Sequence, residues 1–513
     1  MGAYTRAVTS EGGEDFDVVI VGAGLSGIGA ACHLQAECPG KRFVILEARA
    51  ESGGTWDLFR YPGVRSDSDM FTLGYSFRPW REAKAIADGP SILRYIRAAA
   101  HQHGVDRRVR YHRRVVRAAW SSSDARWTVE VENAESGELE RLTCRFLYGN
   151  TGYYRYDEGY SPRFEGASDF GGRIVHPQHW PADLEWEDRS VVVIGSGATA
   201  VTLVPALAAR ASHVTMLQRS PSYVMSLPEH DGIADLLRHL LPERLAYPLV
   251  RWKNVVLTTF VYQLCRRAPR LMARLLKKGV ASQLPADFDV ETHFSPRYSP
   301  WDQRLCFVPD GDLFKALSSG RASVVTGQIE RLTGDGVLLD SGATLDADII
   351  VSATGLNMQM LGGMAITVDG RPLDLAESVA YKGIMLCGVP NLAFTIGYTN
   401  ASWTLKADLA ARYVCRLLNY MDERGARSCR PIPPDPQVPR IPLMDLTSGY
   451  VRRSVDRLPK QAATMPWRLH QNYPLDIMML RRGPLDDQMA FDDGDGDGSS
   501  DMDDAARGVA VVN

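Results

Sequence analysis

The sequence lacks the features that mark membrane-spanning and secreted proteins. No run of about 18 uninterrupted apolar residues occurs, and a helix that crosses a bilayer needs roughly that length. No basic segment followed by an apolar one opens the chain, and the eight cysteines show no regular C-x-x-C spacing. Neither a secretory leader nor a disulfide framework is therefore expected. We predict a large cytoplasmic globular protein in a reducing compartment, without a metal site.

Net charge is also small, at −3 for 513 residues, but it is divided unevenly. Residues 486–513 hold nine Asp and one Arg, a charge of −8, which leaves +5 for the remainder. Residues 244–278 contain nine Lys or Arg and no acid. We interpret this basic segment as the solvated face of ordinary core helices. Because apolar residues 255–262 lie among these cations, peripheral attachment to anionic lipid is an alternative. Sparse base-stacking aromatics argue against nucleic-acid binding.

A chain of this length exceeds one ordinary hydrophobic core, so two or three domains are expected. The first contains a nucleotide-binding pattern. Apolar residues 17–21 predict a strand, GAGLSG follows, residues 28–35 predict a helix, and apolar residues 43–46 predict a second strand. In this pattern a pyrophosphate lies at the helix N-terminus and an acid at the end of the second strand binds a ribose. The residues concerned are Gly22, Gly24, Gly27 and Glu47.

A second nucleotide-binding pattern follows farther along the chain. Residues 190–194 and 214–217 predict strands, and the turn between them, GSGATA, carries Gly195, Gly197 and Ala200. Here the second strand is followed by Arg219 instead of an acid. Arginine pairs with a 2′-phosphate that an acid would repel, so we predict a preference for NADPH over NADH of about ten- to a hundredfold. The alternative is an arginine that serves only solubility.

Two further segments complete these patterns. Residues 53–67 are dense in glycine, proline and aromatic residues, which is typical of a wall against a flat ring. A surface ion pair and ordinary core packing are the alternatives for the Arg, Asp and Trp of this loop. Residues 105–150 alternate apolar and polar positions and predict a β meander.

The segment between the two patterns, FGGRIVHPQHWP at residues 170–181, is rich in aromatic residues and histidine. It resembles the fingerprint F-x-G-x-x-x-H-x-x-x-W-P of class B flavoprotein monooxygenases, and within them of the Baeyer-Villiger monooxygenases. Residues 53–67 resemble a second fingerprint of this family. Residues 54–63, 300–305 and 398–408 are similar to mycobacterial members that activate thioamide prodrugs such as ethionamide. The matching positions are Phe170, Gly172, His176, Trp180 and Pro181, and Gly53, Gly54, Trp56, Tyr61, Pro62, Gly63 and Asp67.

The resemblance implies an α/β protein with two Rossmann-like dinucleotide-binding domains, one for FAD and one for NADPH, and a helical insertion. The expected organisation, in chain order, is a disordered lead-in at 1–15, an FAD-binding domain at 16–155 and 353–485, an NADPH-binding domain at 156–222 and 301–352, a helical insertion at 223–300 and a disordered acidic tail at 486–513. The resemblance also places Gly54, Thr55, Trp56 and Asp67 among the cofactor-binding residues.

The chemistry implied by the resemblance belongs to the cofactors. NADPH reduces FAD, the reduced flavin takes up O2, and the resulting C4a-peroxyflavin attacks a ketone to give an ester or lactone. The implied catalytic residues are Arg304, whose positive charge keeps the peroxide deprotonated, and Asp67, which orients Arg304. The family usually carries Lys before this arginine, whereas this chain has Gln303, which leaves Arg219 more of the contact to the 2′-phosphate. His176 is expected to be structural and conformational more than a proton donor.

Substrate identity is less constrained than the reaction. Tyr61, Asn400 and Trp403 are predicted to border the pocket of a small ketone or thioether, with sulfoxidation as a further activity; no oligomeric state is predicted. Two alternatives remain: an S- or N-oxygenating flavin monooxygenase without ketone activity, and a non-catalytic nucleotide-binding scaffold that docks on membranes. A disulfide reductase would need a redox-active cysteine pair just past the first strands, which residues 53–67 lack.

Overall fold

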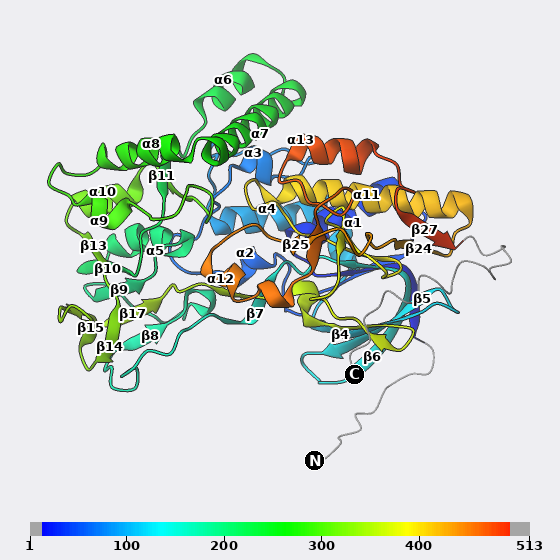
Figure 1. Ribbon diagram of the computed structural model, residues 1–513, viewed down its shortest axis with the longest axis horizontal. Helices are drawn as coiled ribbons and strands as arrows, with labels where there is room; N and C mark the ends of the chain where they lie inside the picture. The colour runs from blue at the N-terminus through cyan, green and yellow to red at the C-terminus, as the bar shows by residue number, and fades with distance from the viewer. Residues whose placement is uncertain (1–12, 493–513) are drawn as a thin grey trace, which may run out of the picture.

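The computed structural model describes residues 13–492, which form two α/β units joined by paired crossovers (Figure 1). The first unit contains a sheet of 11 strands. Its β1 (Glu14–Val21) and β2 (Phe43–Leu46) are largely apolar, buried and parallel, as expected for strands covered on both faces. The meander of β4, β5 and β6 is antiparallel. The other strands of this sheet are β3 (Val109–Arg110), β4 (Arg113–Ser121), β5 (Arg126–Asn133), β6 (Leu139–Gly149), β19 (Ala365–Val368), β20 (Arg371–Pro372), β21 (Ala380–Tyr381), β22 (Met385–Leu386) and β23 (Leu392–Phe394).

Helices cover this sheet where the chain crosses between parallel strands. α1 (Leu25–Glu37) leaves β1 and packs against α11 (Trp403–Arg424), near the C-terminal end of the described chain. Both helices bury most of their residues, so they form part of the first core. α4 (Gly89–Gln102) and four short helices complete the unit: α2 (Thr55–Leu58), α3 (Met70–Leu73), α12 (Gly449–Arg452) and α13 (Tyr473–Asp476).

The second unit is a five-stranded sheet in the order β13-β10-β9-β17-β8, and every pairing in it is parallel. β9 and β10 flank α5, which begins at the second glycine turn. A small antiparallel sheet of β14, β15 and β16 covers one side. The bounds are β8 (Arg173–Val175), β9 (Ser190–Ile194), α5 (Ala198–Ala208), β10 (His213–Gln218), α10 (Asp312–Ser318), β13 (Ala322–Thr326), β14 (Ile329–Thr333), β15 (Gly336–Leu339), β16 (Thr344–Asp346) and β17 (Ile349–Ser352). The predicted fold class, with two Rossmann-like units, is confirmed.

A helical insertion interrupts the second unit between two short parallel strands, β11 (Val224–Leu227) and β12 (Cys306–Pro309). It consists of α6 (Gly232–Leu240), α7 (Glu243–Arg267), α8 (Pro269–Ala281) and α9 (Val290–Phe294). In Figure 1, α6 and the adjoining part of α7 project from the top of the molecule. Within residues 13–492, no helix combines the length and apolar character that a membrane crossing requires.

The chain passes between the units twice, and the two crossovers pair with each other. β7 (Tyr154–Gly159) leaves the first unit, and β18 (Leu356–Met358) returns to it as the antiparallel partner of β7. Residues 425–492 then wrap over the first unit and contribute β24 (Ser428–Pro431), β25 (Arg440–Pro442), β26 (Lys460–Ala462) and β27 (Met489–Asp492).

The two ends of the described chain, at residues 14–15 and 486–492, are more ordered than the composition predicts. β1 already begins at Glu14, because the long neighbouring strand β6 offers backbone partners to this residue and the next. β27 lies inside the expected acidic tail, where it pairs with β24 and buries Met489. Pairing and apolar contact therefore outweigh the acidic composition at this position. Residues 1–12 and 493–513 lie outside the part of the chain that the structure describes.

A buried charge cluster joins three helices that pack in the first core, α1, α11 and α7. His33 of α1 lies 3.3 Å from Glu37 and 3.3 Å from Asp408 of α11, measured between ring nitrogens and carboxylate oxygens. Arg251 of α7 approaches the same Asp408 at 3.7 Å. Burial by itself would lower the pKa of His33, but its hydrogen bonds with Asp408 and Glu37 outweigh burial and raise this pKa to about 9.

This cluster predicts a pH-dependent stability. The pKa of His33 is near 6.5 in an unfolded chain, so its protonated form stabilises the fold fully below that pH. The contribution, about 3 kcal/mol, is lost as pH rises through the folded value. We expect the thermal unfolding midpoint to fall between pH 6.5 and about 9, and His33→Gln to remove much of this slope. An equal slope in wild type and variant would contradict the assignment.

Candidate active site

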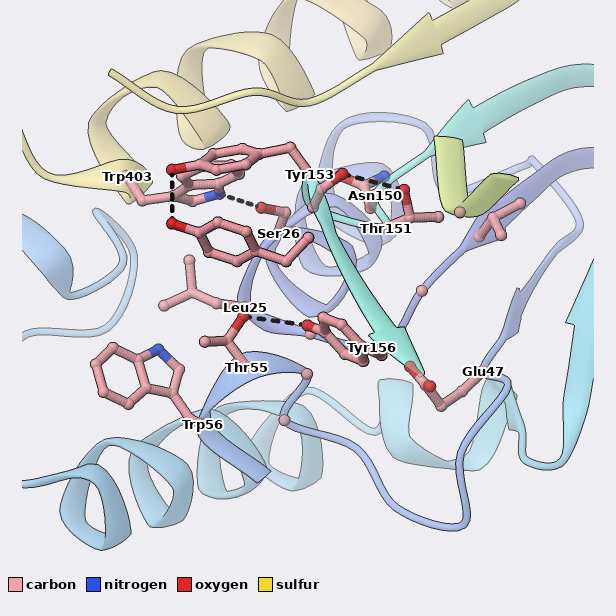
Figure 2. Close-up of a pocket in the computed structure, with 18 of the residues that line it drawn as sticks. Leu25, Ser26, Glu47, Thr55, Trp56, Asn150, Thr151, Tyr153, Tyr156 and Trp403 are labelled. Carbon is pink, nitrogen blue, oxygen red and sulfur yellow. Dashed lines mark hydrogen bonds between the residues drawn. The ribbon is translucent and has the colours of Figure 1, made fainter. Parts of the chain in front are cut away.

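A cavity of about 530 Å³ lies at the carboxyl ends of β1 and β2 and reaches to the crossovers between the units (Figure 2). The first glycine turn and Glu47 line one part of it, and the loop before α2 forms a second wall. The crossover residues after β6 and the start of α11 line another part. Arg304 comes from the second unit, so both units contribute to one site.

The first glycine turn is shaped for close approach of a ligand. Gly22 has φ +102°, and a Cβ there would lie 2.7 Å from the carbonyl oxygen of Asn150. Gly24 and Gly54 face each other so closely that a Cβ on Gly54 would lie 2.9 Å from the Cα of Gly24. No side chain caps the N-terminus of α1. Backbone N–H groups therefore remain for an anion, and these residues fit the pyrophosphate of a dinucleotide.

Glu47 lies at the end of β2, as predicted, and lines the cavity. Its Oε2 accepts a hydrogen bond from the N–H of Ala23 at 2.7 Å, and its Oε1 accepts one from the N–H of Arg49 at 3.0 Å. Burial raises the pKa of this carboxyl. Each oxygen retains a further lone pair for a ribose hydroxyl, so the two backbone bonds position the carboxylate for that contact.

Aromatic side chains gather toward the junction of the units. The indole of Trp403 packs on the ring of Tyr153 with centroids 5.2 Å apart, and its Nε1 donates to Ser26 Oγ at 2.6 Å. Tyr156 shares a hydrogen bond of 3.1 Å with Thr55, whose neighbour Trp56 also borders the cavity (Figure 2). The walls at this end are therefore flat and largely apolar, which suits a planar ring system.

Arg304 and Asp67 meet at the cavity wall. The Nη1 of Arg304 lies 3.5 Å from an oxygen of Asp67, and its Nη2 donates to the hydroxyl of Tyr153 at 3.3 Å. The buried Nε of this guanidinium has no protein partner within residues 13–492. The facing hydroxyl of Tyr153, together with Tyr450 and Asp67, raises the pKa of Arg304. A permanent positive charge therefore faces the cavity, held by two oxygens.

The second glycine turn has the same local design. Gly195 has φ +142°, a Cβ there would lie 2.4 Å from the carbonyl oxygen of Ala353, and no side chain caps α5. Ala200 is buried in the core beneath the turn. Arg219 follows β10 as an exposed side chain that pairs with no residue of the described chain. This turn lies outside the lining of the 530 Å³ cavity, and its open helix N-terminus fits the pyrophosphate of a second dinucleotide.

The residues of the 170–181 segment lie at the crossovers and do not line the cavity. The ring of His176 packs directly on Gly159 of β7. A Cβ on Gly159 would lie only 2.0 Å from this ring. Its Nδ1 accepts from the N–H of Gln178 at 3.1 Å, so its Nε2 donates to the carbonyl of Gly355 at 3.2 Å. Burial lowers the pKa of His176. The neutral ring of His176 therefore contacts both crossovers, at Gly159 and at Gly355.

The other positions of this segment pack within the second unit. Phe170 is buried, and Gly172 allows the chain to pass the carbonyl of Asp348, which a Cβ would approach to 2.1 Å. Trp180, next to Pro181, makes an edge-on contact with Trp186 at 5.9 Å between ring centroids. Most of the segment therefore packs within the second unit, and His176 is the position that contacts the crossovers.

Two of the three predicted pocket residues do not line the cavity. Tyr61 is buried in the core of the second unit, because the loop after α2 turns Gly63 against α5. Asn400 is buried just before α11 and donates to the carbonyl of Gln471 at 2.8 Å, beside a smaller cavity bordered by α7. Only Trp403 lines the main cavity. Tyr153, Tyr154 and Tyr156 also line the cavity and were not predicted, although three tyrosines just after the end of β6 are visible in the sequence.

Two glycine turns that each open a helix, one of them lining a cavity with a guanidinium at its wall, are typical of an oxidoreductase that uses two nucleotide cofactors. Residues 82–361 match the family described as flavin-binding monooxygenase-like, and residues 20–87 match the NAD(P)-binding Rossmann-like domain. The chain belongs to the flavin-binding monooxygenase-like family and is a flavoprotein monooxygenase. The resemblance to the class B enzymes is confirmed.

Individual relatives agree with this assignment. FAD-containing monooxygenase EthA of Mycobacterium tuberculosis is 56% identical over 476 residues, which cover 93% of this chain and 97% of the relative. Probable FAD-binding monooxygenase AlmA of Acinetobacter baylyi is 48% identical over 473 residues, 92% of this chain and 95% of the relative. Oxidized steroid monooxygenase bound to NADP has a TM-score of 0.73 at 22% identity, covering 94% of this chain and 100% of that chain. This last similarity concerns the fold alone.

Proposed function

We propose that the protein is an FAD- and NADPH-dependent Baeyer-Villiger monooxygenase. It inserts one oxygen atom of O2 beside a ketone carbonyl and releases an ester or lactone. The observation that supports this most directly is the guanidinium of Arg304 at the cavity wall, paired with Asp67 at 3.5 Å. The alternative of a non-catalytic scaffold is not retained, because the chain belongs to a family of monooxygenases.

FAD and NADPH are the cofactors of this chain. The first turn, with Gly22, Gly24 and Gly54, holds the pyrophosphate of FAD, and Glu47 holds its ribose. The second turn and Arg219 hold NADPH, whose 2′-phosphate suits an arginine without a protein partner. When bound, NADPH supplies hydride and the flavin supplies the activation of O2.

The protein contributes charge, orientation and exclusion of water. Arg304 favours the deprotonated form of any group bound beside it, since a fixed positive charge stabilises an adjacent anion. Asp67 and Tyr153 hold the guanidinium in place from two sides. Trp403 and Tyr153 present apolar faces that limit water near the reacting atoms.

Sulfoxidation of thioethers, and of thioamide prodrugs such as ethionamide, is proposed as a further activity of the same site. Oxygen transfer draws on the cofactor, and the aromatic wall accepts an apolar substrate whether its reactive atom is carbon or sulfur. An enzyme that oxygenates sulfur or nitrogen and leaves ketones unchanged is the alternative.

Arg219 predicts the choice of nicotinamide cofactor. Arg219→Ala is expected to lower kcat/KM for NADPH by about ten- to a hundredfold, because one charge-assisted hydrogen bond to the 2′-phosphate is lost. The value for NADH should stay unchanged, since NADH has no such phosphate. Steady-state NADPH and NADH oxidation measure both constants. An equal loss for the two cofactors would contradict this role.

Product analysis tests the proposed reaction. The wild type is incubated with NADPH, O2 and a panel of linear ketones, cyclic ketones and a thioether, and the products are identified by mass spectrometry. Esters or lactones that are reduced in Arg304→Ala support the proposal. Sulfoxide without any ester establishes the alternative oxygenase, and esters undiminished in Arg304→Ala overturn the role of this residue.

A further inference from the structure

The helical insertion exposes an unusual amount of apolar side chain. Sixteen large apolar residues are exposed within residues 13–492, and eleven of them lie on α6, α7 and α8. Single exposed apolar residues are common on protein surfaces, but a contiguous cluster marks an interaction site. The concentration of exposed apolar side chains on three consecutive helices therefore indicates a binding surface.

On α7 the exposed apolar residues form one stripe along the helix. All but one of the steps between them are three or four residues, which places them on one face that runs about 22 Å at 1.5 Å per residue. The opposite face is buried: Tyr247, Val250 and Arg251 pack against the first unit. The exposed stripe consists of Leu245, Leu249, Trp252, Val256, Leu257 and Phe260, which are 45–62% exposed.

The two neighbouring helices extend this stripe. Ile233, Leu236 and Leu240 repeat at helical spacing on α6 and are 57–65% exposed. Leu271 and Leu275 are each 50% exposed, one turn apart on α8. Figure 1 shows α6 and part of α7 projecting beyond the two sheets, so the surface lies at the outside of the molecule. We call residues 233–275 of these three helices the apolar insertion face.

Unpaired cations accompany the apolar insertion face. Four of the nine cations in residues 244–278 have acidic partners: Arg251 with Asp408, Lys253 with Asp231, Arg266 with Asp302 and Lys277 with Glu291. The other five pair with no acid of the described chain: Arg244, Arg267, Arg270, Arg274 and Lys278. An apolar face accompanied by unpaired cations matches the interface of an anionic bilayer, with acyl chains beneath negative headgroups.

We propose that the apolar insertion face docks the enzyme on an anionic lipid surface, with α7 lying in the plane of the interface. A second copy of the chain fits less well, because a two-fold contact through this face would bring the same unpaired cations together. The docking is peripheral, since no helix of residues 13–492 is long and apolar enough to span a bilayer. Arg251 donates hydrogen bonds to the carbonyl oxygens of Phe71 and Gly74, which attach α7 to the first unit.

Vesicle sedimentation of the full-length holoenzyme tests this proposal. Vesicles of phosphatidylglycerol should carry the protein down at low salt and release most of it at high salt, whereas phosphatidylcholine vesicles should bind it weakly. The triple variant Arg267→Gln, Arg270→Gln and Arg274→Gln should bind phosphatidylglycerol about a hundredfold more weakly, because each cation near the surface contributes about 1 kcal/mol, or about fivefold. Leu249→Ser combined with Phe260→Ser should weaken binding to both kinds of vesicle.

Matched controls separate docking from general effects. Ile432→Ser and Met465→Ser replace apolar residues that are 42% and 43% exposed on the C-terminal wrap, and both should bind lipid like the wild type. All variants should oxidise NADPH at the wild-type rate, which shows that they are folded. No binding to phosphatidylglycerol at low salt overturns the proposal. So does lipid-independent self-association in sedimentation velocity that the Leu249→Ser and Phe260→Ser changes abolish.

Discussion

Replacing Arg304 by alanine is expected to lower the rate of substrate oxygenation by about a hundred- to a thousandfold, the loss typical for one preorganised electrostatic group. The guanidinium contributes the fixed positive charge at the junction of the units, held by Asp67 and Tyr153. It does not belong to either glycine turn, so FAD should remain bound and the protein yellow. NADPH oxidation in air should continue and yield hydrogen peroxide in place of oxygenated product.

Companion variants test the reason for this loss. Arg304→Lys keeps the charge but not the two-sided geometry, and it should recover only part of the activity. Asp67→Asn keeps Arg304 charged but removes the acid that orients it, so its effect should be smaller than that of Arg304→Ala. Arg126→Ala removes a comparably exposed arginine that is paired with Asp15 and does not line the cavity, so it should leave oxygenation unchanged. Full product formation by Arg304→Ala would refute the proposed role.

The strands and the glycine turns were predictable because local sequence determines them. β2 and β9 have the predicted bounds, since a short run of apolar residues that is buried on both faces has few other structures available. The turns were predictable for a similar reason. Gly22 and Gly195 adopt positive φ and approach a neighbouring carbonyl, which residues with a Cβ rarely tolerate.

The pocket walls depended on packing between segments that are distant in sequence. Asn400 and Trp403 are three residues apart, yet one is buried against Gln471 and the other lines the cavity beside Tyr153. The pairing of Arg304 with Tyr153 joins residues 151 positions apart, and no local pattern specifies it. The position of Tyr61 also depends on long-range packing, since it is buried where the loop after α2 contacts the second unit.

Gly54→Val is expected to weaken FAD binding by about a hundredfold or more, because a side chain forced into a packed site costs about 1–3 kcal/mol and the valine must also adopt a strained backbone. The Cβ would lie 2.9 Å from the Cα of Gly24 and 3.3 Å from the hydroxyl of Tyr156, on the wall that approaches the pyrophosphate turn. Neither neighbour is a flexible side-chain end, since Gly24 opens α1 and Tyr156 is held by Thr55. The purified variant should be nearly colourless, as measured by the flavin absorbance per mole of protein.

Gly104→Val is the matched control for this prediction. Gly104 has φ +66°, close to the +57° of Gly54, but a Cβ there meets no atom within 4 Å. Gly104 lies in the left-handed helical region with ψ 13°, whereas Gly54 has ψ −124°, a region that residues with a Cβ tolerate less well. Gly104→Val therefore controls for a positive φ alone, and only Gly54→Val places a side chain against the turn. If Gly104→Val keeps its flavin while Gly54→Val loses it, a positive φ alone does not cause the loss, and the cofactor site requires the backbone conformation of Gly54 together with its close approach to Gly24. Full flavin content in Gly54→Val would mean that FAD is bound without this approach, and the assignment of the first turn to the pyrophosphate would be wrong.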